Sequence, residues 1–215
     1  MRDTFARINR DVAQCRRCDR LCHYNAQLKL DYPHYHLAPV GSWGDTSPRI
    51  MIVGLAPGLH GAGASGRAFI GDDSGKFLFE SLYRAKLSSS AAAKDAQLSK
   101  VRITNLVKCL PPKNAPNGSE RNACSAHLNR EMALFAPPGA RSTRVVVALG
   151  GMAHAALCRY FNTQADFEHG GSMQLRNRVH LVSSFHPSRL NVNTGRLTTA
   201  MMDEVWVTVK RLVKR

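Results

Sequence analysis

The chain has 215 residues, of which 44% are hydrophobic, so one substantial core is expected and residues 1–215 are predicted to form a single domain. Lys and Arg number 30 against 15 acidic residues, and the formal charge of +15 favours nucleic acid as a partner over an anionic membrane surface. No apolar run is long enough to span a bilayer, and the first residues lack a signal peptide's apolar core, so we expect a cytoplasmic protein.

The predicted elements begin with an irregular segment. Residues 1–48 are rich in Cys, His, Tyr, Pro and Gly and show no sustained periodicity beyond one short first helix, so this segment is expected to need a staple. Residues 49–53 form a short apolar run that ends at Gly54, which predicts a strand buried on both faces. A helix is then predicted with Ser74 as its N-cap.

Strands and helices alternate along the rest of the chain. Residues 88–100 are predicted to form a loop or weak helix, and 186–197 a loop. Strands are expected at 101–107, 143–150 and 178–185, and helices at 119–135, at 151–161 and from about 198 to the C-terminus. This alternation predicts a parallel sheet covered on both faces, with ligands at the C-terminal ends of its strands.

Four of the six cysteines have the spacing of one metal site. Cys15 and Cys18 form a C-x2-C pair with two arginines between the thiols, and Cys109 and Cys124 form a second pair. Two loop-borne pairs far apart in sequence commonly build a four-thiolate site for zinc or for an iron–sulfur cluster, and spacing alone does not separate these two. Cys22 is either a replacement for Cys18 or a bystander.

The glycine-rich stretch 54–75 fails the usual phosphate-binding patterns. A Walker loop needs Ser or Thr after its Gly-Lys pair, but Phe77 stands there. A dinucleotide fingerprint fails as well, because Leu55, Ala56 and Pro57 follow the strand. We therefore expect these glycines to let a planar ligand or a sugar–phosphate backbone approach the main chain closely.

Three stretches in chain order resemble the iron–sulfur uracil-DNA glycosylases, specifically the type 5 branch of that superfamily. They are GLAPGLHGAGASGRAFIGDDSG, TNLVKCLPPKN and HPSRLN, and the resemblance spans nearly the whole chain. It implies a monomeric three-layer α/β/α fold with a central four-stranded parallel sheet. It also implies hydrolytic excision of uracil from DNA, with hypoxanthine, xanthine or modified pyrimidines as further substrates in some members. The implied cofactor is a [4Fe–4S] cluster, with zinc as the alternative, on Cys15, Cys18, Cys109 and Cys124.

The resemblance also assigns roles to residues near the predicted strand ends. Phe69 is expected to stack on the flipped base beside Gly54 and Ala56, although a loop Phe is often a core residue instead. Asn105 is expected to read a uracil edge with its amide, with the capping of a turn as the alternative. His186 is expected to donate a hydrogen bond to a uracil carbonyl oxygen as negative charge develops there.

Further residues are expected to contact the DNA. Leu190 lies four residues after the catalytic histidine, where related glycosylases carry an apolar wedge that fills the gap left by the flipped base. Arginines on either side of it would bind phosphates. The predicted DNA contacts are His60, Arg67, Ser188, Arg189, Leu190 and Arg196.

The acid that orients the attacking water cannot be taken from the type 4 pattern, because Leu55 stands where type 4 enzymes carry Glu. Asp72 matches an Asp implicated in type 5 members, with the complementing of a helix dipole as its alternative role. Asp73 is a competitor. The rival hypothesis is a nucleic-acid-binding protein without catalysis, built around a structural metal centre, in which Leu55 marks lost activity.

Overall fold

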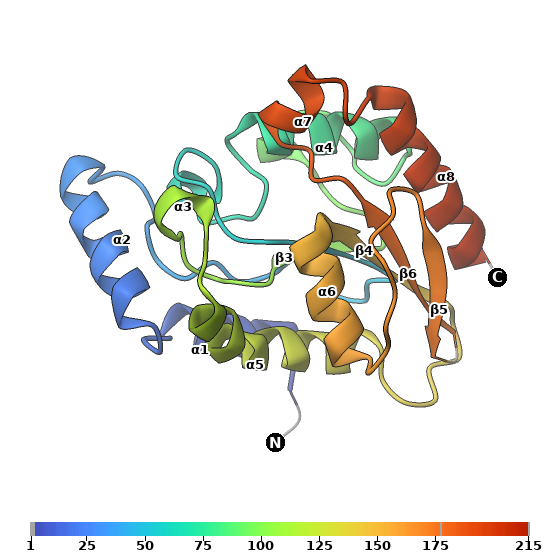
Figure 1. Ribbon diagram of the computed structural model, residues 1–215, viewed down its shortest axis with the longest axis horizontal. Helices are drawn as coiled ribbons and strands as arrows, with labels where there is room; N and C mark the ends of the chain where they lie inside the picture. The colour runs from blue at the N-terminus through green and yellow to red at the C-terminus, as the bar shows by residue number, and fades with distance from the viewer. Residues whose placement is uncertain (1–2, 177, 215) are drawn as a thin grey trace.

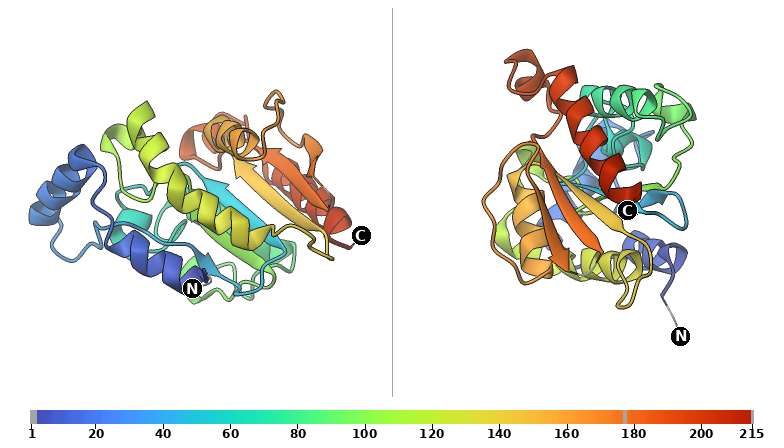
Figure 2. Two further views of the ribbon diagram at one scale, coloured as in Figure 1. Left: turned by 90° about the horizontal axis from the view of Figure 1, so that it is seen from below. Right: turned by 90° about the vertical axis from the view of Figure 1, so that its right-hand side faces the viewer.

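The computed structural model describes residues 3–176 and 178–214. At its centre lies a six-stranded sheet with the strand order β1-β3-β2-β4-β6-β5. Helices cover both faces of this sheet, which gives three layers (Figure 1). The right-hand view of Figure 2 shows the sheet edge-on between the two helix layers.

The four inner strands run parallel. They are β3 (Val101–Asn105), β2 (Ile50–Gly54), β4 (Arg144–Leu149) and β6 (Val179–Ser184). Nearly all of their residues are buried, as parallel strands with helices on both faces require. Their C-terminal ends lie at one edge of the sheet, where Gly54 is in register with Asn105.

Two antiparallel strands extend the sheet beyond the four that were expected. β1 (Trp43–Gly44) pairs with β3, and β5 (Ser172–Arg176) pairs with β6. The four inner strands are parallel as expected, but the sheet as a whole has six strands. β1 is too short to carry a pattern, and β5 is a polar edge strand whose residues are only half-buried or exposed.

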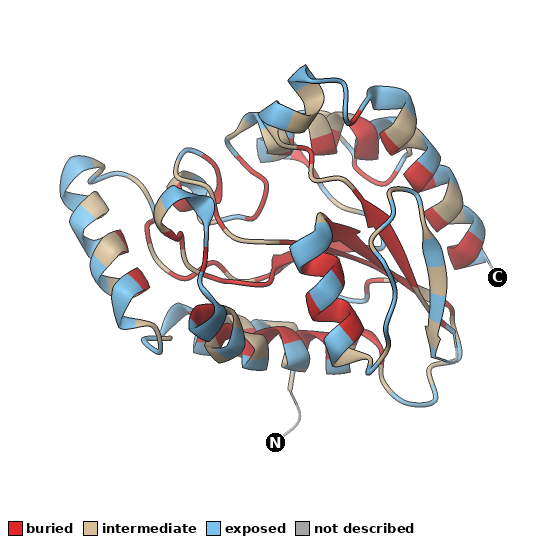
Figure 3. Cartoon of the chain, in the orientation of Figure 1, coloured by how far each residue is buried: buried red, intermediate tan, exposed pale blue. Residues whose placement is uncertain are grey.

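Alternate residues of the inner strands pack against different helix layers. Ile50 and Ile52 join the core under α4 (Asp73–Arg84) and α8 (Thr199–Lys214), whereas Met51 belongs to the core under α5 (Gly118–Phe135) and α6 (Gly151–Tyr160). This division follows from the two-residue repeat of a strand. Figure 3 shows the buried faces of these helices turned toward the sheet.

Over residues 3–48, the N-terminal segment contains two helices, one more than was expected. It contains α1 (Phe5–Ala13), which is capped by Thr4, and α2 (Asp19–Asp31). The prediction of irregular structure over 1–48 was wrong for α2 because only Leu21 and Asn25 of that helix are buried, so its sequence lacks an apolar stripe.

Two smaller predictions also need correction. The N-cap of α4 is Asp72, not Ser74, because the Asp72 side chain accepts a hydrogen bond from the backbone N–H of Gly75. The stretch 186–197 contains a short helix, α7, which Ser188 caps. The remaining short elements are α3 (Ala62–Ser65), η1 (Ala93–Asp95), η2 (Pro112–Asn114) and α7 (Arg189–Asn193).

Among residues 3–176 and 178–214, no helix has both the length and the apolar character needed to cross a bilayer.

Candidate active site

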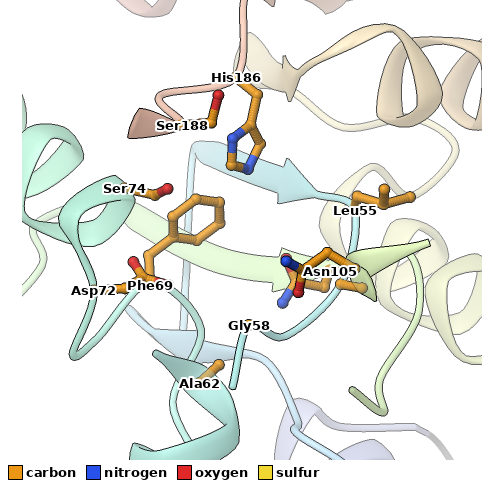
Figure 4. A pocket seen from close by; sticks show the side chains of 11 residues that line it. Leu55, Gly58, Ala62, Phe69, Asp72, Ser74, Asn105, His186 and Ser188 are labelled. Atoms are coloured by element: carbon orange, nitrogen blue, oxygen red, sulfur yellow. The ribbon is translucent and has the colours of Figure 1, made fainter. Parts of the chain in front are cut away.

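A cavity of about 280 Å³ lies at the C-terminal ends of the parallel strands (Figure 4). Its volume is close to the lower limit of about 300 Å³ for ligand pockets, which suits one small ring rather than a dinucleotide. Loops after β2, β3 and β6 and the start of α4 all contribute to its wall. The lining residues are Leu55, Ala56, Gly58, Ala62, Phe69, Asp72, Ser74, Asn105, Asn114, His186 and Ser188.

Gly54 lets two of these side chains approach the end of β2. A Cβ atom on Gly54 would lie 2.5 Å from Asn105 Oδ1 and 2.8 Å from the Phe69 ring. Contacts that short would force both side chains to move. The glycine at the strand end is thus required by the packing of Asn105 and Phe69.

Phe69 is held in an unfavourable backbone conformation. Its φ is +61°, in a region where a bulky residue costs about 1–3 kcal/mol. The Phe69 carbonyl packs against Gly75, where an added Cβ would lie only 2.1 Å away. The ring is 8% exposed, and its centroid lies 5.8 Å from that of His186 at an interplanar angle of 33°. This geometry leaves the ring on one wall of the cavity.

Asn105 brings an unpaired polar atom to the same cavity. The residue is 3% exposed, and its Oδ1 has no hydrogen-bond partner among the described residues. A buried acceptor without a partner costs about 1–3 kcal/mol, so this oxygen is suited to receive a hydrogen bond from a ligand.

Asp72 has two roles available to its two oxygens. Oδ1 accepts from the Gly75 N–H at 2.8 Å and caps α4. Oδ2 packs closely against Gly61 and Gly58. A Cβ atom added at Gly61 or Gly58 would lie 2.1 Å or 3.3 Å from it, respectively. The neighbouring Asp73 instead accepts from Arg189 Nε at 2.7 Å and does not line the cavity.

His186 enters the cavity from the loop after β6 (Figure 4). Burial lowers the pKa of His186, and the nearby Asp72 charge opposes that shift only in part. The imidazole is therefore neutral at pH 7 and carries one N–H donor. The Asn191 side chain donates to the His186 carbonyl oxygen at 2.8 Å and fixes the loop.

Of the predicted DNA contacts, only Ser188 lines the cavity. Leu190 is 71% exposed on α7, next to the Arg189–Asp73 ion pair. The guanidinium of Arg196 lies 4.6 Å from the centre of the Phe185 ring. Ser188, Leu190 and Arg196 all belong to the stretch of chain that follows His186.

The other two predicted contacts belong to the glycine-rich loop. Exposed Arg67 lies with its guanidinium 4.1 Å from the centre of the Trp43 ring. His60 is also exposed, and its Nδ1 lies 3.0 Å from the Tyr35 hydroxyl. Neither side chain lines the cavity.

Two polar lining residues were not assigned a site role from sequence. Ser74 was expected as a helix cap, but it is the second residue of α4 and lines the cavity. Asn114 ends η2 with a φ of +55° and lines the cavity as well. Only the position of Asn114 in the loop after a predicted strand could have indicated from sequence that it lines the site.

A second, smaller cavity gathers thiols. Cys15, Cys18, Cys22, Cys109 and Cys124 all line it, together with the apolar side chains of Leu21, Val107 and Ala123. The two cysteine pairs that were expected to form one site therefore lie together, and Cys22 lies beside them. The Lys108 backbone N–H donates to Cys124 Sγ at 3.2 Å.

Burial makes the Cys109 and Cys124 thiols poor acids. It raises the pKa of Cys109 to about 12 and that of Cys124 to about 11. Neighbouring cysteines add to the shift at both residues, whereas Lys108 lowers the pKa of Cys124. Within residues 3–176 and 178–214, no group of three or more His, Cys, Asp or Glu side chains is arranged to hold a single metal ion.

Comparison with known proteins identifies the family. The sequence model of the Uracil DNA glycosylase superfamily matches residues 42–210. The type-5 uracil-DNA glycosylase of Mycobacterium leprae is 38% identical over 220 residues, which cover 95% of this chain and 94% of the relative. The chain belongs to the type-5 branch of this superfamily. The resemblance to this family that the sequence motifs indicated is thereby confirmed.

Other relatives agree with this assignment. The type-5 enzyme of Pyrobaculum aerophilum is 40% identical over 207 residues, covering 92% of this chain and 88% of the relative. A type-4 enzyme of the same organism is 32% identical over only 133 residues, or 61% of this chain. The crystal structure of Pedobacter heparinus SMUG2 has a TM-score of 0.51 at 14% identity and covers 80% of this chain and 78% of its own, a likeness of fold.

Proposed function

We propose that this protein excises uracil from DNA by hydrolysing the N-glycosidic bond, which leaves an abasic site for base excision repair. The observation that carries the proposal is the meeting of Phe69, Asn105 and His186 at one base-sized cavity. Family membership supports it, because the type-5 relatives are named as uracil-DNA glycosylases.

Asn105 is proposed to select uracil. The edge of uracil offers an N–H donor beside a carbonyl acceptor, and an amide side chain complements this pair by accepting and donating at once. The unpaired Oδ1 of Asn105 is the acceptor that such a base would need. Cytosine offers no ring N–H at that position, so it would leave this oxygen without a partner.

Phe69 and His186 are proposed to act on the two stages of the reaction. The Phe69 ring supplies a stacking surface for a base that has left the duplex. His186 then donates a hydrogen bond to a carbonyl oxygen of the base as it leaves with a negative charge. A neutral imidazole suits this role, and burial keeps it neutral by lowering the pKa of His186.

Asp72 is proposed to orient the attacking water. Leu55 lines the cavity but has no polar group, so it cannot do so. Asp72 lines the same cavity, and capping of α4 occupies only its Oδ1. Its Oδ2 is left for a water or for the positive charge that develops on the sugar.

DNA binding is proposed to depend on the positive charge of the protein and on the residues that follow His186. A formal charge of +15 favours the phosphate backbone. Leu190 is 71% exposed on a short helix, as an apolar wedge between bases would need to be. Arg196 follows the loop that carries His186, and Arg67 belongs to the glycine-rich loop, so both supply cations on segments that contribute to the cavity. Arg189 must exchange Asp73 for a phosphate.

The thiol cavity is proposed to hold a [4Fe–4S] cluster on Cys15, Cys18, Cys109 and Cys124. Support comes from the donor set: the thiols share one small cavity with apolar walls, and a backbone N–H points at Cys124 Sγ. A bound cation would favour the thiolates that burial disfavours. The cluster would tie α2 to the loop after β3 and to α5 and needs no part in the hydrolysis.

Finer features of the function are proposed from the family pattern. They are a monomeric state, a cytoplasmic location and activity on hypoxanthine, xanthine or modified pyrimidines.

One assay tests the proposed activity. End-labelled duplexes with a single uracil, hypoxanthine or xanthine are incubated with the protein and then treated with alkali, with undamaged DNA as control. Cleavage at the lesion only after alkali is the expected result and indicates a glycosylase without lyase activity. No cleavage of any lesion by metal-replete protein would favour the non-catalytic binding protein.

Two variants test the residue roles in the same assay. Asp72→Asn and His186→Ala should bind uracil-containing DNA but lose turnover by about 100-fold or more, since each removes a charge or donor aimed at the reacting atoms. Asp73→Asn is the matched control for the acid, because Asp73 is adjacent and does not line the cavity. His34→Ala, at an exposed histidine, is the control for His186. Full activity of His186→Ala would contradict its assignment.

A further inference from the structure

The thiol cavity contains one cysteine more than a four-thiolate site uses. Cys22 lines it together with Cys15, Cys18, Cys109 and Cys124. Cys18 is the N-cap residue of α2, and the Cys22 N–H donates to the Cys18 carbonyl oxygen at 2.9 Å. The two thiols are therefore one helical turn apart on the same face of α2.

Contacts of the next helical turn hold this face of α2 in place. The Asn25 side chain is buried and donates to the carbonyl oxygens of Leu21 and Leu110, at 2.7 Å and 2.8 Å. Leu110 directly follows Cys109. The rotation of α2 relative to the loop that carries Cys109 is thus fixed, and it keeps Cys22 facing the cavity.

Cys22 also differs from Cys18 in the spaces that it lines. An adjoining groove of about 220 Å³ is lined by Cys15, Cys22 and Cys109, whereas Cys18 and Cys124 line only the thiol cavity. Cys22 lies at the boundary between the two spaces, where a thiol can meet both the metal centre and solvent.

We propose that Cys22 is a reserve ligand of the metal centre, placed to take the coordination position of Cys18. This inference rests on the metal-centre part of the proposed function and not on the glycosylase activity. One turn of helix separates the two thiols, so α2 would not have to unfold for the exchange.

The exchange balances without an oxidant or a reductant. The bond from iron to Cys18 Sγ breaks, and a bond from iron to Cys22 Sγ forms. The proton that leaves the Cys22 thiol ends on Cys18, which becomes a free thiol, and no electron is gained or lost. The number of thiolates on the metal is unchanged.

The test compares single and double thiol deletions in the full-length protein. Iron, acid-labile sulfide and visible absorption are measured for Cys18→Ala, Cys22→Ala and the double variant after anaerobic purification. The Cys18 side chain makes no capping hydrogen bond, so its loss does not remove a helix contact. Cys15→Ala removes a proposed ligand that has no reserve thiol one helical turn away. Cys158→Ala, buried in α6, controls for the loss of a core thiol.

The expected result is that both single variants keep a full complement of iron, while the double variant and Cys15→Ala lose most of it. A Cys18→Ala variant as depleted as the double variant would overturn the proposal. So would a double variant that keeps its iron, since neither thiol would then be a ligand.

Alkylation of Cys22 gives a second test, whose result does not depend on the stability of the variants. Iodoacetamide should modify Cys22 in the wild-type holoprotein, and mass spectrometry should find that residue protected in Cys18→Ala. Equal labelling of Cys22 in both proteins would contradict the exchange. A wild-type protein that contains no iron would refute this proposal, while the alkali-cleavage assay would still decide the glycosylase activity independently.

Discussion

The buried ion pair between Lys108 and Glu131 provides the sharpest test of the energetics of this fold. Lys108 Nζ lies 2.8 Å from Glu131 Oε2 and 2.6 Å from Thr104 Oγ1, and the two ionic side chains are 1% and 0% exposed. The pair joins the loop after β3 to α5. The loss of this ion pair should therefore lower the free energy of unfolding of the whole fold.

Glu131→Gln removes the negative charge but keeps the shape of the side chain. Breaking a fully buried pair leaves an uncompensated charge and costs about 3–5 kcal/mol of unfolding free energy. A chain of this size loses about 2–4 °C of melting temperature per kcal/mol, so a decrease of about 6–20 °C is expected. Replacing both partners by Met should recover most of the loss, because no buried charge then remains.

The assay is thermal or urea unfolding of variants matched for metal content. Asp203→Asn is the control, since the Arg84–Asp203 pair is 40% and 39% exposed and such pairs contribute about 0–1 kcal/mol. A Glu131→Gln variant that loses no more stability than Asp203→Asn would refute the reasoning from burial.

Two further predictions concern pH and the cavity. Burial lowers the pKa of His127, His169 and His186 below the usual 6.5. The unfolded chain therefore binds more protons than the folded chain at mildly acidic pH. The contribution of these histidines to the free energy of unfolding is complete above pH 6.5 and should decline as the pH falls below that value. Unfolding free energies that stay constant between pH 6.5 and 4.5 would contradict this. Gly54→Ala should lower kcat/KM about 100-fold by displacing Asn105. Gly118→Ala, whose added Cβ would meet its nearest atom at 3.8 Å, is the control, and equal kinetics of the two variants would exclude the steric argument.

The sequence predicted the inner sheet well. Strands such as β4 are continuous apolar runs, and the residues that follow parallel strands lie at one edge because those strands end together. The family resemblance assigned Phe69, Asn105 and His186 to one site, and all three line the cavity at that edge. The helix α2 could not be predicted, because its neighbours rather than an apolar stripe stabilise it.

Other features were decided only by the tertiary structure. The sequence offered two adjacent acids, and the backbone that leads from Phe69 into α4 turned Asp72 toward the cavity and Asp73 toward Arg189. Likewise, the sequence left Cys22 as a replacement or a bystander. Its position beside Cys109 depends on how α2 packs against a loop 85 residues away along the chain. Local patterns specify which face of an element is apolar, but contacts between distant segments set the directions of individual polar side chains.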